Sequence, residues 1–260
     1  MQDVHDEERT RVIDALIGGG CIAPHEEAEA LLSAASEGVG PIDELIARRL
    51  RGEPLAWITG WVIFCGLRLQ VDPSVFVPRP HTERLALRAA SLLPPHGTAV
   101  DLCTGCGAVA AVLTATHPKA TVVATDIDPV AAACARGNGV RALVGDLDEP
   151  LPATLLGRVD LMTAVVPYVP TEEFHLLPRD VRAHEPATAL DGGEGGTRVL
   201  LRAAEAAGRW LRRGGSVLLE LGGDQAAVVA EALLRAGVSE IRLHRDEDGE
   251  ARAIEGRRQS

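Results

Sequence analysis

The stretch Val100-Asp101-Leu102-Cys103-Thr104-Gly105-Cys106-Gly107-Ala108 decides the fold. It joins an apolar run suited to a buried strand, at residues 98–103, to a helical pattern that begins near residue 109. Two glycines at such a strand-to-helix turn let the backbone approach a ligand closely. The stretch therefore predicts a ligand site at the end of a strand.

Apolar runs and helical patterns alternate on both sides of this turn, which is typical of a parallel sheet covered by helices. We expect strands at 98–103, 121–126, 140–144, 159–165 and 216–221, and helices at 81–93, 109–116, 130–137 and 195–211. Near the end, Asp246-Glu247-Asp248-Gly249 reads as a hairpin turn, so the runs 240–244 and 251–255 are expected to pair antiparallel. A parallel α/β sheet finished by an antiparallel hairpin is the architecture of class I, Rossmann-like methyltransferase domains.

Upstream of the sheet, the periodicity is helical and then changes. Three or four short helices are expected in the first sixty residues, interrupted by Gly18-Gly19-Gly20 and Gly38. The stretch from Trp61 to Pro78 is rich in strand formers and contains turn residues, which predicts a β-hairpin. We therefore expect a small N-terminal helical domain at 1–60, a β-hairpin linker at 61–78 and an α/β domain at 79–260.

Composition and charge exclude several classes of protein. The chain has 260 residues, of which 46% are hydrophobic and 24% charged, as in ordinary globular domains. It contains no apolar run of about 18 residues, and its acidic N-terminus lacks the core of a secretory signal. The net charge of −11 disfavours binding to a phosphate backbone. We expect a cytoplasmic protein that binds neither nucleic acid nor membrane.

Five cysteines are an odd number for a disulfide framework in a cytoplasmic protein. Cys103 and Cys106 form a lone C-x-x-C inside the glycine turn, without a second pair of ligands at zinc spacing. We interpret them as small residues packed near a ligand, and we expect no metal site.

Carboxylates follow three successive expected strands. Asp101 ends the first and Asp126 the second, 21 residues past Gly105, where a carboxylate can bind ribose hydroxyls. After the third, Asp146 can read an adenine amino group while Leu147 packs on the ring. A dinucleotide and S-adenosylmethionine both fit this pattern, and each aspartate could instead cap a helix. Asp101 favours S-adenosylmethionine, whose ammonium group needs a carboxylate partner.

The sequence resembles the PrmC/HemK family, the protein-glutamine N5-methyltransferases that modify the Gly-Gly-Gln loop of peptide-chain release factors. From about residue 50 to the C-terminus, stretches match the family in order and spacing. Besides the glycine turn, they are Gly52-Glu53-Pro54-Leu55-Ala56-Trp57-Ile58-Thr59-Gly60, Phe64-Cys65-Gly66-Leu67, Val77-Pro78-Arg79-Pro80-His81-Thr82-Glu83, Gly145-Asp146-Leu147-Asp148-Glu149-Pro150-Leu151 and His184-Glu185-Pro186-Ala187-Thr188-Ala189-Leu190-Asp191-Gly192-Gly193.

The resemblance implies an S-adenosylmethionine-dependent methyltransferase domain at 79–260 and a release factor, or another protein or peptide, as substrate. It assigns cofactor binding to one set of residues and the floor of the acceptor site to another. The cofactor set is Asp101, Cys103, Thr104, Gly105, Cys106, Gly107, Asp126, Ile127, Asp146 and Leu147. The acceptor set is Val165, Val166, Pro167 and Tyr168, with Arg79 and Glu83 as candidate substrate contacts.

One departure from the family bears on the acceptor. The family's Asn-Pro-Pro-Tyr is here Val165-Val166-Pro167-Tyr168. In the family, the Asn side chain and the next carbonyl bind the target amide and align it for transfer. Val165 has no such acceptor, although the Val166 carbonyl and the Tyr168 ring remain. We therefore expect poor discrimination for an amide and weak or absent activity on glutamine.

Three residue groups near the expected site each allow two interpretations. Arg79 and Glu83 either contact substrate or pair with each other to fix the hairpin. His184 and Glu185 could form a general-base pair, but a structural anchor is favoured. His81 replaces a residue that is usually acidic in the family, and we assign it no role.

Three functional hypotheses remain at this point. The first is a PrmC/HemK-type methyltransferase, or a variant of it repurposed for a hydroxyl, thiol or amine on a small molecule or peptide. The second is a non-catalytic relative that binds S-adenosylmethionine, which the loss of Asn at Val165 favours. The third, a nucleotide-dependent oxidoreductase, is disfavoured by the order of the matching motifs.

Overall fold

A seven-stranded sheet carries the site-forming part of the molecule. The computed structural model describes residues 2–259, with the side chains of all but 2–5, 179 and 180. The strands are β3 (Thr98–Leu102), β4 (Thr121–Asp126), β5 (Ala142–Val144), β6 (Val159–Ala164), β9 (Leu211–Glu220), β10 (Val238–Arg245) and β11 (Ala251–Arg258). Their order is β10-β11-β9-β6-β3-β4-β5. The neighbouring strands in the run β9-β6-β3-β4-β5 are all parallel, whereas β11 is antiparallel to both of its neighbours, β9 and β10. The predicted α/β fold class is confirmed.

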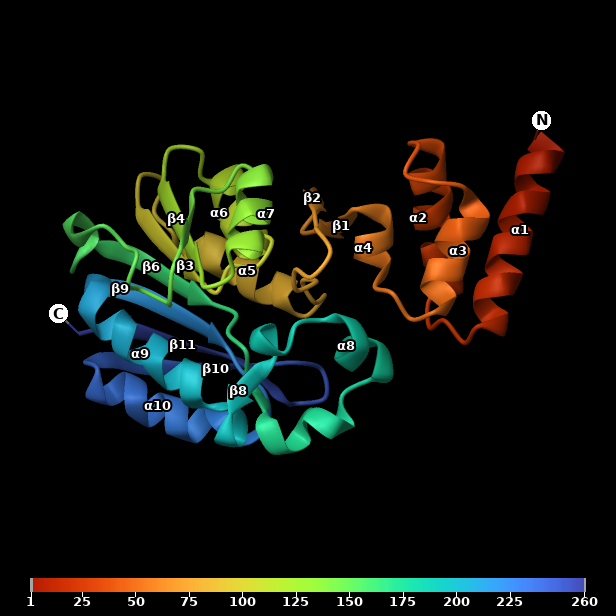
Figure 1. Cartoon of the computed structure of the whole chain (residues 1–260). Helices are drawn as coiled ribbons and strands as arrows, with labels where there is room; N and C mark the ends of the chain where they lie inside the picture. Colours follow the sequence, from red (N-terminus) through yellow and green to blue (C-terminus); the bar gives the residue numbers. More distant parts are fainter. Residues whose placement is uncertain (1, 260) are drawn as a thin grey trace.

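Helices cover both faces of this sheet (Figure 1). One face carries α5 (Thr82–Leu92), α6 (Ala108–Thr116) and α7 (Pro129–Gly137), and the other carries α9 (Arg198–Trp210) and α10 (Ala226–Arg235). Successive strand residues point to opposite faces. Ala99 and Leu161 therefore pack in the first core, and Val100 and Met162 in the second. Burial on both faces explains why the strands read as continuous apolar runs in the sequence.

The N-terminal helices have a core of their own. They are α1 (Gln2–Gly18), α2 (Pro24–Ser36), α3 (Ile42–Leu50) and α4 (Leu55–Thr59). Leu16, Leu31, Leu45 and Ile58 are buried together among them, and α1 to α3 lie at one end of the molecule, away from the sheet (Figure 1). The division of the chain into domains at residues 60 and 78 stays a prediction.

The expected hairpin is present but short. β1 (Trp61–Phe64) pairs antiparallel with β2 (Leu67–Gln70), and pairing ends there. Phe64 and Leu69 are buried in the core beneath α5 to α7, so the hairpin packs against the α/β part. Asn138, at the C-terminal end of α7, donates to the carbonyl oxygens of Gln70 and Cys106 and accepts from Gln70 N. This residue ties the hairpin to the glycine turn.

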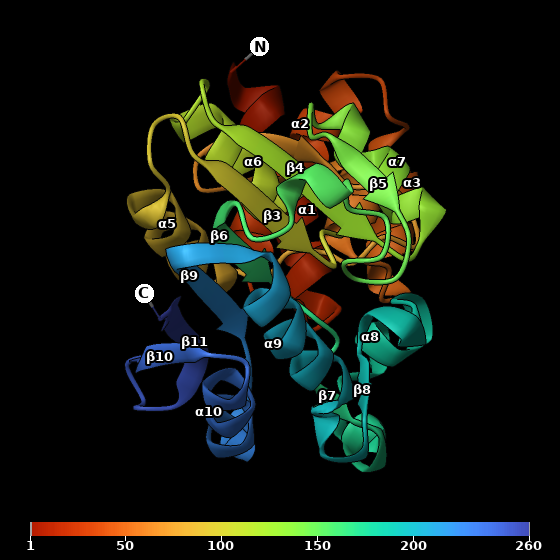
Figure 2. The same ribbon diagram turned by 90° about the vertical axis from the view of Figure 1, so that its left-hand side faces the viewer.

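Two parts of the fold have no counterpart among the predicted elements. One is α10, whose ten residues are mostly Ala, Val and Leu. The other is the excursion after β6, formed by β7 (Val169–Pro170), η2 (Thr171–Leu176), α8 (Arg179–His184), η3 (Ala187–Ala189), β8 (Asp191–Gly193) and η4 (Glu194–Gly196) (Figure 2). Two further short helices are η1 (Ala153–Leu155) and η5 (Gly223–Gln225).

Some predicted bounds also differ from the structure. The helix expected at 195–211 begins only at Arg198, because Gly195 and Gly196 have positive φ angles of 58° and 67°. The strand expected at 216–221 begins at Leu211, directly after α9. Within the described residues, no helix is long and apolar enough to cross a membrane.

Candidate active site

A cavity of about 790 Å³ opens at the carboxyl ends of β3, β4 and β6. Its volume is typical of small-molecule sites, and its place is the one where parallel sheets bind ligands, at the reversal of strand order between β6 and β4. Segment 74–82 after the hairpin and the excursion at 177–191 complete the walls. A single cavity therefore lies where the sequence predicts a ligand site.

The glycine turn adopts the backbone that its sequence predicts. Cys103, Gly105 and Gly107 have positive φ angles of 54°, 57° and 84°. A Cβ on Gly105 would meet nothing closer than 4.0 Å, so this position leaves space beside the cavity. A Cβ on Gly107 would lie 3.0 Å from Ala135 Cβ, which makes Gly107 a packing position against α7. Cys103, Thr104, Gly105 and Cys106 line the cavity, and Gly107 does not.

Asp101 is a buried carboxylate at the floor of the cavity. Its two oxygens accept hydrogen bonds from Thr104 Oγ1 and Thr163 Oγ1, each at 2.6 Å. Burial raises the pKa of Asp101 to about 6, and the threonine hydroxyls only partly offset this effect. A cationic group of a ligand would stabilise the ionised form, which fits the expected role toward an ammonium group.

The raised pKa predicts a pH-dependent gain in stability for Asp101→Asn. The pKa of Asp101 is higher in the folded protein than in the unfolded chain, so ionising the buried carboxylate destabilises the fold. This cost is nearly absent at pH 4, grows as the pH rises toward 6 and is constant above it. We expect the ligand-free variant to gain about 1–3 kcal/mol of unfolding free energy at pH 8 and almost nothing at pH 4. Urea unfolding at both pH values measures this, with Asp128→Asn, a partly exposed carboxylate that also lines the cavity, as control. An equal gain at both pH values would contradict the assignment.

Asp126 is fixed at the next strand end. Its Oδ2 accepts from Gly105 N at 2.8 Å and its Oδ1 from Asp128 N at 3.0 Å. Burial raises its pKa, while these amide donors act in the opposite direction. The carboxylate lines the cavity with its orientation fixed by the backbone, and the side chain of Ile127 beside it is 61% exposed. This is the geometry expected for a group that receives ribose hydroxyls beside an apolar contact.

Asp146 and Leu147 lie at the far wall of the same cavity. Leu147 is buried with a positive φ of 48°, so its side chain is turned into the interior. Asp146 forms an ion pair with Arg202 Nη2 at 3.0 Å. Sequence reasoning missed Arg202, which comes from α9 and also lines the cavity. The carboxylate predicted to read adenine therefore already has a cationic partner.

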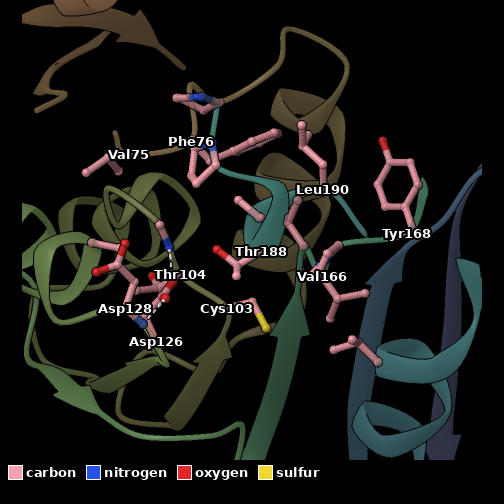
Figure 3. Close-up of a pocket in the computed structure, with 18 of the residues that line it drawn as sticks. Val75, Phe76, Cys103, Thr104, Asp126, Asp128, Val166, Tyr168, Thr188 and Leu190 are labelled. Atoms are coloured by element: carbon pink, nitrogen blue, oxygen red, sulfur yellow. Dashed lines mark hydrogen bonds between the residues drawn. The ribbon is translucent and has the colours of Figure 1, made fainter. Parts of the chain in front are cut away.

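Val165, Val166, Pro167 and Tyr168 line the opposite end of the cavity. Val166 is 2% exposed and Val165 packs against the core beneath α5. Figure 3 shows Cys103 between the Asp126–Asp128 group and the Val166–Tyr168 turn. The remaining wall of this end is largely apolar, formed by Phe76, Val169, Leu177, Val181, Ala187 and Leu190. We call it the acceptor end.

Tyr168 is held by two residues that sequence reasoning missed. Its Oη lies 3.3 Å from Glu220 Oε1, and its carbonyl oxygen accepts from Gln225 Nε2 at 2.7 Å. Gln225 also accepts from Gly222 N, which fixes its amide. Glu220 ends a parallel strand, as Asp101 and Asp126 do, and this shared position was a signal that could have identified it.

The candidate substrate contacts do not pair with each other, so that interpretation is wrong. Arg79 Nη2 instead donates to both oxygens of Glu185, at 2.7 and 2.8 Å, and Glu185 is buried. Glu83 accepts from Cys65 N at 2.9 Å, which fixes the hairpin turn, and it does not line the cavity. The His184 ring packs edge-on to Trp57. These contacts favour the anchoring interpretation of His184 and Glu185.

The cysteines are free thiols in the structure. Burial raises the pKa of both Cys103 and Cys106, so neither is a ready thiolate ligand. Among the residues that the structure describes, no group of three or more His, Cys, Asp or Glu side chains could hold a metal ion.

Curated relatives share most of this chain, although no family model matches it. A release factor glutamine methyltransferase of Geobacter sulfurreducens is 36% identical over 219 residues, which covers 82% of this chain and 76% of the relative. One of Bordetella pertussis is 39% identical over 211 residues, or 78% of this chain and 77% of the relative. A methyltransferase structure from Pyrococcus furiosus, 20% identical, matches the fold with a TM-score of 0.56 over 82% of this chain and 98% of that chain.

The activity in the names of these relatives agrees with the function that the cavity suggests. The identity to several relatives exceeds one third and extends over most of both chains. The sheet order and the carboxylates at the ends of β3 and β4 are those expected for a site that binds S-adenosylmethionine. The chain belongs to the release factor glutamine methyltransferase family and is an S-adenosylmethionine-dependent methyltransferase.

Proposed function

We propose that this enzyme methylates the side-chain amide of a glutamine in a peptide-chain release factor, at a rate limited by its altered acceptor turn. One observation carries the proposal: Asp101, Asp126 and the Val165–Tyr168 turn line the same cavity, with Asp126 and the turn at opposite ends (Figure 3). Cofactor and acceptor can therefore meet within one cavity. The family relatives act on release factors by name, which supports a protein substrate.

The cofactor end has a group for each part of S-adenosylmethionine, which supplies an electrophilic methyl on a sulfonium. Buried Asp101 would pair with the ammonium of the methionine part, and Asp126 would accept the ribose hydroxyls. Ile127 and Leu147 offer apolar contacts for the adenine ring. The assignment of these residues is part of the proposal.

Removing the Asp126 carboxylate should weaken cofactor binding. We expect Asp126→Ala to lose about 1–3 kcal/mol, or roughly 5- to 150-fold in Kd, because charge-assisted hydrogen bonds to the ribose disappear. Isothermal titration with S-adenosylmethionine measures this. The matched control is Asp128→Asn, which lies two residues along the chain, also lines the cavity and keeps a side chain that can cap α7 at Val130 N. An unchanged Kd in Asp126→Ala would show that the cofactor site is misassigned.

At the acceptor end, half of the family's amide clamp would remain. The resemblance assigns the second amide contact to a main-chain carbonyl, which Val166 supplies whatever its side chain. Gln225 and Glu220 hold the turn through the carbonyl and hydroxyl of Tyr168. An amide could therefore enter and be oriented by the backbone alone, with slower transfer than with a side-chain acceptor at position 165.

The apolar wall of the acceptor end favours a second kind of acceptor. Val165, Val166, Val169 and Leu190 present no hydrogen-bond acceptor in their side chains. An amine, thiol or hydroxyl flanked by apolar groups would leave no buried amide unsatisfied there. This candidate keeps the methyltransferase activity and changes only the acceptor.

Two assays separate these candidates. S-adenosylhomocysteine release is measured with a release factor that carries the Gly-Gly-Gln loop, and with the same factor in which the loop glutamine is replaced by alanine. Transfer that depends on the glutamine supports the proposal. Equal S-adenosylhomocysteine release with both factors would show that the methyl group goes to another residue. No S-adenosylhomocysteine release despite cofactor binding would favour the non-catalytic hypothesis.

A further inference from the structure

Glu220 is a buried carboxylate that stands between two cavities. It ends β9, and its side chain is 2% exposed. Its Oε2 accepts from Thr82 Oγ1 at 2.7 Å, and its Oε1 lies 3.3 Å from both Tyr168 Oη and His81 Nε2. Tyr168 lines the acceptor end of the first cavity, whereas Glu220 lines a second cavity of about 460 Å³. His81 lines both, and about a third of its side chain is exposed.

Most of the other charged groups around Glu220 form ion pairs with one another. From α5, Arg84 pairs with Glu247 and Arg88 with Glu255, which His244 of β10 also contacts. The remaining charged side chains that face this region are Arg79, Arg245, Asp246, Asp248 and Arg252; Arg79 pairs with Glu185, Arg252 with Asp246, and Arg245 donates to Gly249 O. In the described part of the chain, the ion-pair partner of Glu220 is thus His81, a side chain whose charge changes with pH.

Methyl transfer to a neutral nitrogen creates a proton that must leave. The nitrogen lone pair forms the new bond to the methyl carbon, the electron pair of the broken carbon–sulfur bond stays on sulfur, and the nitrogen becomes positively charged. A base placed to take the proton lowers the barrier. The valines and Leu190 of the acceptor end offer none. Asp191 also lines the cavity, but hydrogen bonds from Thr171 and Gly193 lower its pKa, which makes it a weak base.

We propose that Tyr168, Glu220 and His81 form a path that carries the proton from the acceptor to the second cavity. The Tyr168 oxygen takes the proton from the methylated nitrogen while its own proton passes to Glu220 Oε1. Glu220 passes that proton to His81 Nε2, and the imidazolium loses one to solvent. Each transfer moves one proton and no electrons. Tyr168 contacts the acceptor, whereas Glu220 and His81 are positioning residues that act through it. The inference rests on the proposed methyl transfer.

Burial and the charge of Glu220 keep Tyr168 protonated between turnovers. Both effects raise the pKa of the Tyr168 hydroxyl well above its ordinary value, so its proton points toward Glu220 over the working range of pH. The hydroxyl oxygen keeps a lone pair that can accept a proton from a group bound in the cavity that Tyr168 lines. A proton path from the acceptor to Glu220 needs the Tyr168 hydroxyl to point in this direction.

The path can be tested without turnover because Tyr168 is the only tyrosine of the chain. Incorporated 3-fluorotyrosine gives one ¹⁹F resonance, which reports the hydrogen bond between Tyr168 and Glu220. We expect this resonance to shift with pH in the wild type, because a histidine lies 3.3 Å from Glu220 Oε1 and histidine is the side chain that ordinarily changes charge near neutral pH. The pH step should vanish in His81→Asn and in Glu220→Gln, and persist in His244→Asn, a matched histidine that lines only the second cavity.

Turnover supplies the second measurement. With a release factor as acceptor, we expect Glu220→Gln to lower kcat by about 100-fold and His81→Asn by about tenfold, while the Kd for S-adenosylmethionine stays unchanged. Both variants should lose the acidic limb of the pH–rate profile, and His244→Asn should keep it. Thermal unfolding of each variant identifies any that fail to fold, and the ¹⁹F spectrum of His81→Asn, a partly exposed position, then still decides.

The outcomes separate this path from the proposed function. Wild-type enzyme that binds S-adenosylmethionine but does not methylate a release factor contradicts the proposed function. The ¹⁹F experiment alone then tests whether Tyr168, Glu220 and His81 are coupled. A ¹⁹F resonance without a pH step, or a step that persists in His81→Asn, overturns the path. So does a folded Glu220→Gln variant with the rate and pH profile of the wild type.

Discussion

Val165→Asn combined with Val166→Pro should raise methylation of a Gly-Gly-Gln release factor by tens- to several-hundredfold. The two changes restore the family's turn at the acceptor end of the cavity, where both positions line the wall. An oriented side-chain acceptor aligns the amide with the methyl donor and could lower the barrier by about 2–4 kcal/mol. A radiolabelled methyl assay on wild type and double variant measures the effect.

The control for this gain is Val165→Ala with Val166→Pro. It changes the shape of the turn and adds space without supplying an oxygen, so a rise in this variant would point to steric relief alone. If the enzyme instead serves an apolar acceptor, Val165→Asn leaves glutamine transfer near background. It also impairs the natural reaction, because a polar side chain is then buried without a partner. Wild-type activity already equal to that of an Asn-Pro-Pro-Tyr relative would contradict the importance of position 165.

Gly196→Ala should destabilise the protein by about 3 kcal/mol or more and abolish ordered packing around Tyr168. Gly196 has a φ of +67°, and a Cβ there would overlap the Tyr168 carbonyl oxygen and the Gln225 amide nitrogen. The variant therefore adds a steric clash to the cost of a left-handed conformation, which alone is about 1–2 kcal/mol for a residue other than glycine. Urea unfolding measures the loss.

Gly195→Ala is the matched control for this prediction. Gly195 has a similar φ of +58°, but a Cβ there would meet nothing within 4 Å. We expect only the conformational cost, about 1–2 kcal/mol, and methyl transfer close to that of the wild type. Equal destabilisation by the two substitutions would show that the contact of Gly196 with Tyr168 and Gln225 does not constrain the acceptor turn.

Local pattern was sufficient to predict much of the site. Asp101 and Asp126 end neighbouring parallel strands, and such ends meet at one edge of a sheet, so both side chains were expected to face one ligand. The glycine turn was predicted on the same basis, since Cys103 and Gly105 adopt the conformation that close approach requires. These features depend on residues that are near each other in the sequence.

The missed contacts depend on how distant elements pack. Arg202 reaches Asp146 across 56 residues, because α9 contacts the loop after β5, where Arg209 and Trp210 also bind Asp148. Glu220 reaches Tyr168 across 52 residues, because β9 pairs with β6. Arg79 pairs with Glu185 across 106 residues, because the excursion after β6 returns toward the hairpin segment. Neither periodicity nor turn chemistry specifies such pairs, which follow only from the tertiary arrangement.

The most direct test of the account is the identity of the methylated residue. The wild-type enzyme is incubated with S-adenosylmethionine carrying a deuterated methyl group and with a Gly-Gly-Gln release factor, and the products are mapped by tandem mass spectrometry. We expect one labelled methyl group on the loop glutamine, formed slowly by the wild type and at least tenfold faster by the Val165→Asn, Val166→Pro variant. Cofactor binding without label on the release factor from either enzyme, or label on another residue, would contradict it.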